Sequence, residues 1–293
     1  MTEILKALFM GLIQGITEFL PISSSGHLSL FRHFFGFEGA AGLFSAMLHI
    51  GTLVAIIIYF YKPIYHLFDE FIMCFKDIRD KQFTLKLSEM NSARRMLLMF
   101  IISCVPLLIL LLPAGEGKSI MDAVDVFSSD DSILAEGICF MITGFILLLG
   151  SAVSQSTKTH RRILPLSAFL IGVAQFFAAC FPGISRSGST ISTGLCLKIR
   201  KNDMIAYSFI LSIPAVLASG LSEFKDALET DEIIPVLPLL IGVLTAAVVG
   251  IFAIKLLIKL LQKNKFKYFG YYCMVLGLAV TVTGFIEKFI GVR

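Results

Sequence analysis

The chain has 293 residues, of which 56% are hydrophobic and only 16% are charged, and its mean hydropathy is +0.85. A composition this apolar excludes a soluble globular domain and is typical of a protein that crosses a membrane several times. The net charge of +4 is modest and gives no support to nucleic-acid binding.

The first predicted element is a pair of short apolar segments within residues 4–37. A polar sequence joins them: Pro21-Ile22-Ser23-Ser24-Ser25-Gly26. Because lipid does not solvate hydroxyl groups or non-helical backbone, we expect a re-entrant helical hairpin, with two ordinary spans kinked at Ser and Pro as the alternative. The first twenty residues of the chain contain Glu3, Lys6 and Glu18 and lack a small-residue cleavage site, so we interpret them as part of the mature protein and not as a signal peptide.

Six further stretches are apolar and long enough to cross a hydrocarbon core, which takes roughly 20 helical residues. They are residues 43–62, 96–113, 133–153, 203–222, 234–258 and 268–290. Residues 164–200 form a second pair of short apolar segments, joined between Pro182 and Gly188. We therefore predict an all-α polytopic membrane protein with about six transmembrane helices and two re-entrant helical hairpins.

The two predicted hairpins carry related polar sequences. The matched positions are Gln14 with Gln175, Pro21 with Pro182, and Ser25-Gly26 with Ser187-Gly188 after a one-residue insertion. Hydrophobic segments that are broken at corresponding places in two halves indicate an inverted-topology repeat with a site near the bilayer midplane. We predict one membrane domain made of two repeats, 1–153 and 162–293, each with one hairpin and three spans, and a site between the hairpins.

Charges in the connecting segments predict how the chain crosses the membrane. Residues 62–95 hold seven Lys and Arg, residues 154–163 hold three, and residues 255–267 hold five Lys. Residues 114–132 and 223–232 each hold one Lys and five acidic residues. By the positive-inside rule, the first three segments are cytoplasmic and the last two lie outside. Both chain termini then lie outside, the first hairpin opens outward and the second opens inward.

The first hairpin holds candidates for proton chemistry. Gln14 and Glu18 are four residues apart and share one helix face. An ionisable residue inside an apolar segment is a functional candidate by default, and the alternative is a structural ion pair with a basic residue of the other repeat. Ser23 and Ser24 precede a second helix whose N-terminal N–H groups suit an anion. His27 is a candidate acid, base or nucleophile, or else a hydrogen-bonded helix contact.

The second hairpin exchanges the acid for a cation. Ala179 stands where the first copy has Glu18, and Arg186 stands where the first copy has Ser24. The hydroxyl residues around this arginine are Ser185, Ser187, Ser189 and Thr190. A guanidinium group with convergent hydroxyls at a helix N-terminus is typical of a phosphate-binding site.

The sequence lacks the motifs of several other kinds of catalytic or metal site. The sequence has no H-E-x-x-H, no Cys/His zinc spacing, no Walker loop and no G-x-S-x-G element. Lipid phosphatases that form a phosphohistidine need a His after their Ser-Arg pair, and none follows His160. The six cysteines show no paired spacing and are interpreted as buried thiols. Ser45, His49 and Thr52 lie on one side of a predicted span and are candidates for bordering the site.

The two motifs closely resemble those of the undecaprenyl-diphosphate phosphatases, the bacitracin-resistance membrane family. The first family motif is Glu or Gln, three residues and Glu, followed by Pro-x-Ser-Ser-x-Gly-His, and it runs here from Gln14 to His27. The second, Pro-Gly-x-Ser-Arg-Ser-Gly-x-Thr, runs from Pro182 to Thr190. The resemblance extends over essentially the whole chain.

The resemblance implies hydrolysis of undecaprenyl diphosphate, a polyprenyl diphosphate lipid, to the monophosphate carrier of cell-wall synthesis. It implies that the site faces the outside of the bacterial cell membrane and uses a divalent cation, Mg²⁺ or Ca²⁺. It implies that Glu18 and His27 are catalytic and that Ser24 is a candidate nucleophile. The residues that it implies for diphosphate binding are Arg186, Ser185 and Thr190, with Ser187 and Ser23 as further candidates. Members with Glu at the position of Gln14 have a second carboxylate for metal or proton handling, and the neutral Gln14 weakens any scheme with two carboxylates.

A polyprenyl-phosphate lipid transporter is the competing function class, because inverted repeats with half-helices are typical of transporters as well. Transport alone does not require Glu18 and His27 beside hydroxyl groups, so the sequence favours the phosphatase. The choice of Ser24, His27 or water as the nucleophile stays open at this point, and so does a homodimeric assembly.

Overall fold

The computed structural model describes residues 2–35, 43–84, 86–115, 118–120, 133–156, 161–181, 183–228 and 235–290. Within these ranges the chain is almost entirely helical, as predicted. The departures are a short antiparallel strand pair, β1 (Pro113–Gly115) with β2 (Lys118–Ser119), and an isolated bridge between Arg161 and Ile199.

Five helices in the described residues are long and apolar enough to cross a membrane. Four of them are α7 (Leu134–Ser156), α10 (Lys201–Leu228), α11 (Val236–Gln262) and α12 (Lys267–Ile290). The fifth consists of α5 (Ser92–Cys104) and the 3-10 helix η2 (Val105–Leu111). Pro106 lies at the start of η2 and has no N–H group to continue the α-helical hydrogen bonds, which explains the change of helix type.

The predicted span at 43–62 ends earlier than expected. Helix α3 (Leu43–Tyr59) has 17 residues and is followed by α4 (Tyr61–Arg79), which is bent from it by 85°. Pro63 explains the bend, because in a continuous helix its ring would clash with the carbonyl of Tyr59, whereas in the first turn of α4 it is tolerated. The two helices are long and apolar enough for a span only when taken together, so the described residues contain five candidate spans, or six with the bent pair.

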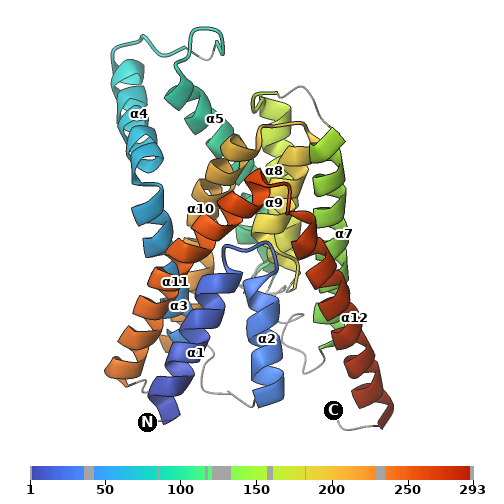
Figure 1. Ribbon diagram of the computed structural model, residues 1–293. Coiled ribbons are helices and arrows are strands. Elements are labelled where there is room, and N and C mark those ends of the chain that lie inside the picture. Colours follow the sequence, from blue (N-terminus) through green and yellow to red (C-terminus); the bar gives the residue numbers. More distant parts are fainter. Residues whose placement is uncertain are drawn as a thin grey trace.

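Two pairs of shorter helices lie among the long ones. They are α1 (Thr2–Thr17) with α2 (Ser24–Phe35), and α8 (Pro165–Cys180) with α9 (Arg186–Cys196). At 11 to 16 residues, each is shorter than the roughly 20 residues that a span requires. Figure 1 shows α1 and α2 running from one end of the molecule to a loop near its middle, while α8 and α9 occupy the other half. We call these pairs the first and the second hairpin.

The loops of the two hairpins touch each other and α7. A Cβ atom added to Gly26 would lie 2.9 Å from the Cα atom of Gly183 and 2.6 Å from the ring of Phe140 on α7. Gly183 has a φ of +91°, in the left-handed region that side chains disfavour. Glycine at both positions therefore allows two backbones to meet at the middle of the helix bundle.

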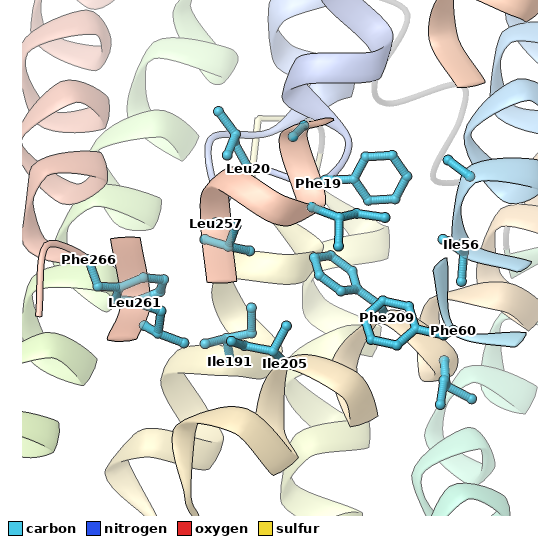
Figure 2. Close-up of a cluster of buried hydrophobic side chains, with 14 of the residues drawn as sticks. Phe19, Leu20, Ile56, Phe60, Ile191, Ile205, Phe209, Leu257, Leu261 and Phe266 are labelled. Atoms are coloured by element: carbon cyan, nitrogen blue, oxygen red, sulfur yellow. The ribbon is translucent and has the colours of Figure 1, made fainter. Parts of the chain in front are cut away.

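The largest cluster of buried side chains among the described residues includes residues of both hairpins (Figure 2). Phe19, from the first hairpin, packs edge-on against Phe209 of α10, with ring centroids 5.6 Å apart. Ile191 of α9 belongs to the same cluster. Small residues permit close helix packing elsewhere, because a Cβ atom on Gly15 of α1 would lie 2.8 Å from the carbonyl oxygen of Ala246 on α11. Side-chain packing therefore fixes both hairpins against long helices.

Candidate functional site

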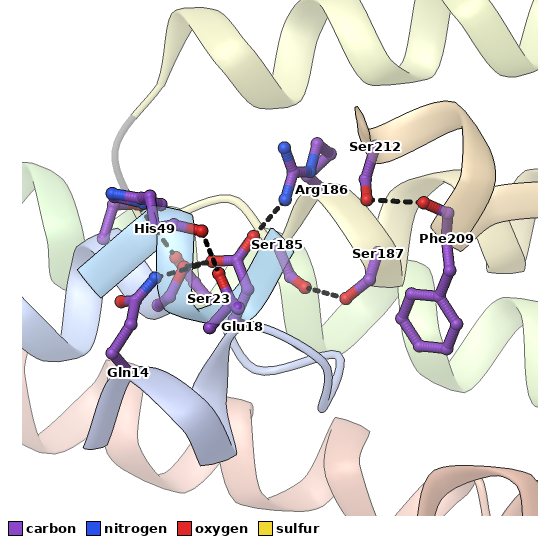
Figure 3. Close-up of polar contacts among 12 residues, drawn as sticks. Gln14, Glu18, Ser23, His49, Ser185, Arg186, Ser187, Phe209 and Ser212 are labelled. Atoms are coloured by element: carbon purple, nitrogen blue, oxygen red, sulfur yellow. Dashed lines mark hydrogen bonds and ion pairs between the residues drawn. The ribbon is translucent and has the colours of Figure 1, made fainter. Parts of the chain in front are cut away.

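The central residue of the site is Glu18, which follows the last residue of α1 and has a side chain only 3% exposed. Both carboxylate oxygens accept hydrogen bonds (Figure 3). Ser24 Oγ donates to Oε2 at 2.6 Å, and Gln14 Nε2 donates to the same oxygen at 3.2 Å. Arg186 of the second hairpin donates through a terminal guanidinium nitrogen to Oε1. The structure thus joins four of the predicted site residues in one polar network.

The ion pair between Glu18 and Arg186 connects the two hairpins directly. Sequence considerations left a functional Glu18 and a Glu18 paired with a basic residue of the other repeat as alternatives, and the structure contains the pair. Removing a charge from water is costly unless the charge is paired and hydrogen-bonded, so each residue makes burial of the other tolerable. An anion that binds Arg186 therefore competes with the Glu18 carboxylate.

The loop of the first hairpin is shaped by Ser23, which has a φ of +69° and is buried. Its hydroxyl accepts a hydrogen bond from the Gly26 N–H at 3.3 Å, in the manner of a helix N-cap. Its carbonyl oxygen accepts one from His27 Nδ1 at 2.7 Å. These bonds hold the start of α2, and with it Ser24, beside Glu18.

The loop of the second hairpin is held by Ser185 and by Thr143 of α7. Ser185 Oγ caps α9 by accepting from the Gly188 N–H at 3.1 Å. Thr143 Oγ1 accepts from the Ser185 N–H at 3.0 Å and donates to the Gly183 carbonyl oxygen at 3.1 Å. The sequence motifs gave no sign of Thr143, because its contact with this loop depends on how α7 packs.

A cavity of about 450 Å³ lies between the hairpin loops, a volume within the usual range for ligand pockets. Its described polar lining from the hairpins comprises Thr17, Glu18, Ser23, Ser24, Ser25, Ser29, Arg32, Ser185, Arg186 and Ser187. An apolar wall comes from Leu107, Leu108 and Leu111 of η2 and from Ala215 and Val216 of α10. One cavity thus offers a charged end and an apolar wall, as an amphiphilic ligand requires.

Thr190, another predicted diphosphate-binding residue, is not among the described residues that line this cavity. Its hydroxyl contacts the Arg186 carbonyl oxygen at 3.0 Å and the Ser208 hydroxyl at 2.6 Å, and the residue is 1% exposed. Thr190 therefore supports the first turn of α9, the turn that presents Arg186.

His27 also lies away from the cavity, in an apolar groove beside α12. Its Nδ1 contacts a carbonyl oxygen and must carry a proton, so in the neutral ring Nε2 is the acceptor. Tyr272 of α12 supplies the matching donor, with its hydroxyl 2.7 Å from Nε2 and its ring stacked on the imidazole. The structure separates His27 from the Glu18 network, and no sequence motif pointed to Tyr272.

Of the three α3 candidates, His49 lines the cavity among the described residues, whereas Ser45 and Thr52 do not. His49 Nδ1 donates to the Ser45 carbonyl oxygen at 3.0 Å, and Thr52 Oγ1 donates to the His49 carbonyl oxygen at 2.8 Å. The structure also adds Glu136 of α7 to the lining. The sequence could have identified Glu136 as a candidate site residue, because an acidic residue within a predicted span is a functional candidate in the same way as Glu18.

The described residues contain no group of three or more His, Cys, Asp and Glu side chains that could hold a metal ion. Mg²⁺ is often bound by one or two carboxylates together with substrate phosphates. Glu18 offers such a carboxylate, and the neighbouring Gln14 Oε1 is buried without a hydrogen-bond donor in the described structure. The donor set fits a cation shared with a diphosphate ligand.

Comparisons with known proteins agree with the motif resemblance. The family model described as bacitracin resistance protein BacA matches residues 7–279. The chain is 36% identical over 284 residues to an undecaprenyl-diphosphatase of Methanosphaera stadtmanae, covering 96% of this chain and 98% of that protein. It is 34% identical over 290 residues to an undecaprenyl-diphosphatase of Bacteroides thetaiotaomicron, covering 95% and 98%. The predicted family is therefore confirmed, and the chain belongs to the bacitracin resistance protein BacA family.

Proposed function

We propose that this protein hydrolyses undecaprenyl diphosphate to undecaprenyl phosphate and inorganic phosphate in the cavity between the two hairpin loops. The observation that carries the proposal is the contact of Ser24, Glu18 and Arg186, which combines a hydroxyl, its proton acceptor and an anion-binding group. Relatives named undecaprenyl-diphosphatase align over nearly their whole length. The activity recycles the carrier lipid for peptidoglycan synthesis and gives resistance to bacitracin.

The second hairpin binds the terminal phosphate. Arg186 presents its guanidinium fork, and the Ser187 and Ser185 hydroxyls lie beside it. Backbone N–H groups at the start of α9 and the positive end of its dipole add further attraction for an anion. The apolar wall along η2 accommodates the start of the isoprenoid chain.

The first hairpin carries out the proton transfer. When the diphosphate engages Arg186, Glu18 loses its cationic partner and becomes a stronger base. Ser24 Oγ, already 2.6 Å from Glu18 Oε2, attacks the terminal phosphorus and passes its proton to that oxygen. Glu18, through its carboxylate, and Gln14, through Oε1, would hold a Mg²⁺ or Ca²⁺ ion. When bound, the cation would neutralise part of the diphosphate charge.

His27 acts by holding the loop and not by touching the phosphate. Its two hydrogen bonds connect the Ser23 carbonyl oxygen to Tyr272 on α12. Because Ser23 has a left-handed backbone conformation, the loop needs such external support to keep Ser24 beside Glu18. The histidine of the family motif is thus assigned a positioning role.

The proposed topology is an inverted repeat of two units, 1–153 and 162–293, each a re-entrant hairpin plus three spans, in one membrane domain. In Figure 1, α1 begins and α12 ends at the bottom of the view, whereas the turn from α11 to α12 lies above the middle of the molecule, on the side away from the termini. The lysines around that turn favour a cytoplasmic location for it. Arg32 and Ser219 line the cavity toward the end with the termini, which favours a site open to the outside of the bacterial cell membrane.

Hydrolysis fits the site better than lipid transport alone. A transporter needs to bind and release the phosphate headgroup, which Arg186 achieves without help from a hydroxyl group paired with a carboxylate. The short hydrogen bond from Ser24 to Glu18 places a nucleophile and a base together. Transport of the product lipid by the same fold remains the second candidate function.

The decisive experiment measures phosphate release from undecaprenyl diphosphate by the purified full-length protein, with and without a chelator. We expect release that the chelator abolishes and that Glu18→Gln lowers about 100-fold or more, the scale of a lost general base. Glu3→Gln is the matched control, because the Glu3 side chain is exposed and pairs with Lys6 at 3.1 Å. Absence of release from folded protein that still binds the lipid would contradict the phosphatase and favour transport.

A further inference from the structure

Glu136 is a second carboxylate in the cavity that the proposed mechanism does not use. It lies in the first turn of α7 and is 3% exposed. Glu18 and Glu136 are the two acidic residues in the described lining of the cavity. A buried carboxylate in a cavity that binds a diphosphate needs an explanation, because burial of a charge is costly.

The position of Glu136 relative to Ser24 follows from α2. Ser29 Oγ donates to Glu136 Oε1 at 2.7 Å. Ser29 comes five residues after Ser24 on the same helix, so it lies about 7 Å further along the helix axis. Ser24, Ser29 and Glu136 all line the same cavity, so Glu136 and the nucleophile face one ligand space from different positions along α2.

The backbone at Glu136 is fixed against the second hairpin. A Cβ atom on Gly183 would lie 3.0 Å from the Glu136 carbonyl oxygen and 3.2 Å from its Cα atom. Two turns further along α7, Thr143 bonds to both Gly183 and Ser185. Glu136 is thus held by the element that also positions the phosphate-binding loop.

The two carboxylates have different hydrogen-bond partners. Glu18 accepts from Ser24, Gln14 and Arg186. Glu136 accepts from Ser29 and lines the same cavity, whose lining also includes the exposed residues Ser25 and Arg32. Glu18 is therefore placed to take a proton from Ser24, and Glu136 is the other carboxylate of the cavity that can take a proton.

We propose that Glu136 is the proton acceptor for the water that hydrolyses a phosphoryl group from Ser24, so that the two half-reactions use two different carboxylates. This inference rests on the proposed phosphatase function with Ser24 as nucleophile. It gives the chain a second catalytic carboxylate on α7, outside both hairpin motifs, while position 14 is the neutral Gln14.

In the first half-reaction the Ser24 Oγ–P bond forms and the anhydride P–O bond breaks. The Ser24 proton goes to Glu18, and undecaprenyl phosphate leaves. In the second half-reaction the oxygen of water bonds to phosphorus and the Ser24 Oγ–P bond breaks. One proton of the water goes to Glu136, and Glu18 returns its proton to Ser24 Oγ. Inorganic phosphate then leaves, and Glu136 releases its proton to solvent.

The test follows both products of terminally radiolabelled undecaprenyl diphosphate in a rapid-quench experiment with full-length Glu136→Gln protein. The amide keeps an oxygen that can accept from Ser29 but cannot serve as the base. We expect about one equivalent of undecaprenyl phosphate per protein at the parent rate, label retained on Ser24, and phosphate release about 100-fold slower. Glu136→Asp should restore part of the steady rate.

Two variants control for structural effects. Glu287→Gln alters a carboxylate that pairs with His33 and is not in the described cavity lining, and it should keep parent kinetics. Ser29→Ala removes the hydrogen bond to Glu136 but leaves the carboxylate, so it should slow phosphate release less than Glu136→Gln does. If Glu136→Gln unfolds at a markedly lower temperature than the parent protein, Glu136→Asp is tested in its place. The inference then predicts that Glu136→Asp forms undecaprenyl phosphate in a burst at the parent rate and releases inorganic phosphate more slowly afterwards.

Parent turnover in Glu136→Gln would overturn the inference and leave Glu136 with a structural role at the start of α7. Equal slowing of both products without bound label would also overturn it, because Glu136 would then act before any phosphoenzyme forms. Absence of both products from the parent protein would instead contradict the proposed phosphatase function. The two failures are therefore distinguishable.

Discussion

At the scale of single residues, the site is organised by the ion pair of Glu18 and Arg186. The side chain of Glu18 is 3% exposed and that of Arg186 is 20% exposed, so water screens the pair little from the Glu18 side. In such surroundings, removing Glu18 or Arg186 leaves the charge of the other residue uncompensated. Replacing the planar guanidinium group of Arg186 by another cation keeps the charge but alters how phosphate is bound. The two residues have different expected phenotypes for this reason.

Arg186→Lys should lower kcat/KM for undecaprenyl diphosphate about 100-fold or more, although the positive charge remains. Lysine offers a point charge and cannot reproduce the planar fork that binds two phosphate oxygens. Steady-state phosphate release measures the effect. Arg200→Lys is the control, since Arg200 is an exposed residue paired with Asp203, and parent-like activity in Arg186→Lys would contradict the assigned clamp.

His27→Ala should lower both the activity and the thermal unfolding temperature, because it breaks the connection between the Ser23 carbonyl oxygen and Tyr272. Loss of these hydrogen bonds should cost about 1 to 3 kcal/mol of stability. Tyr272→Phe should produce a smaller change in the same direction. Lost activity with unchanged thermal unfolding in His27→Ala would instead give His27 a chemical role.

The sequence predicted Gln14, Glu18, Ser24 and Arg186 as one site because residue type, spacing and the repeated motif all pointed to them, and the structure brings them together. It could not show which way the His27 ring points, because its partner Tyr272 lies 245 residues away. The acidity of Glu136 was visible in the sequence, but its place in the cavity depends on packing between α2 and α7.

At the scale of elements, α7 braces both hairpin loops. Phe140 lies against Gly26, and Thr143 bonds to both sides of the turn at Gly183 and Ser185. The apolar patterns predicted a helical chain with about six spans, and the described residues contain five candidate spans, or six with the bent pair. They did not predict the 85° bend between α3 and α4, which depends on where Pro63 starts a new helix.

Gly183→Ala should destabilise the protein by about 2 kcal/mol or more. Its φ of +91° is strained for alanine, and the new Cβ atom would lie 2.8 Å from Cys139 Cβ. Gly220→Ala in α10 is the matched control, because the nearest atom to its added Cβ is 4.0 Å away and alanine favours helix. Thermal unfolding of the two variants measures the difference, and equal unfolding temperatures would contradict the packing described here.

At the scale of the whole molecule, the arrangement separates an end with the termini from an end rich in basic residues. Ion pairs join α4 to α5. Arg94 contacts Glu70 at 2.6 Å and Asp77 at 2.5 Å. These contacts hold α4 against the start of α5.

Topology mapping tests this orientation. A reporter enzyme that is active only outside the cytoplasm should be active when fused after α12 and inactive when inserted at Asn264, in the turn before α12. The expected result follows from the lysines of residues 255–267 and the positive-inside rule. Activity at Asn264 together with inactivity after α12 would reverse the orientation of the cavity.

The ion pair between the hairpins also sets a threshold for ligand charge. Because Glu18 already satisfies Arg186, a resting cavity has little net attraction for weakly charged anions, and only a ligand with several negative charges can displace the carboxylate. The diphosphate exceeds this threshold before cleavage, and each product carries less charge after it. In the proposed mechanism, reformation of the pair then favours release of the products, so the same contact that selects the substrate also limits product retention.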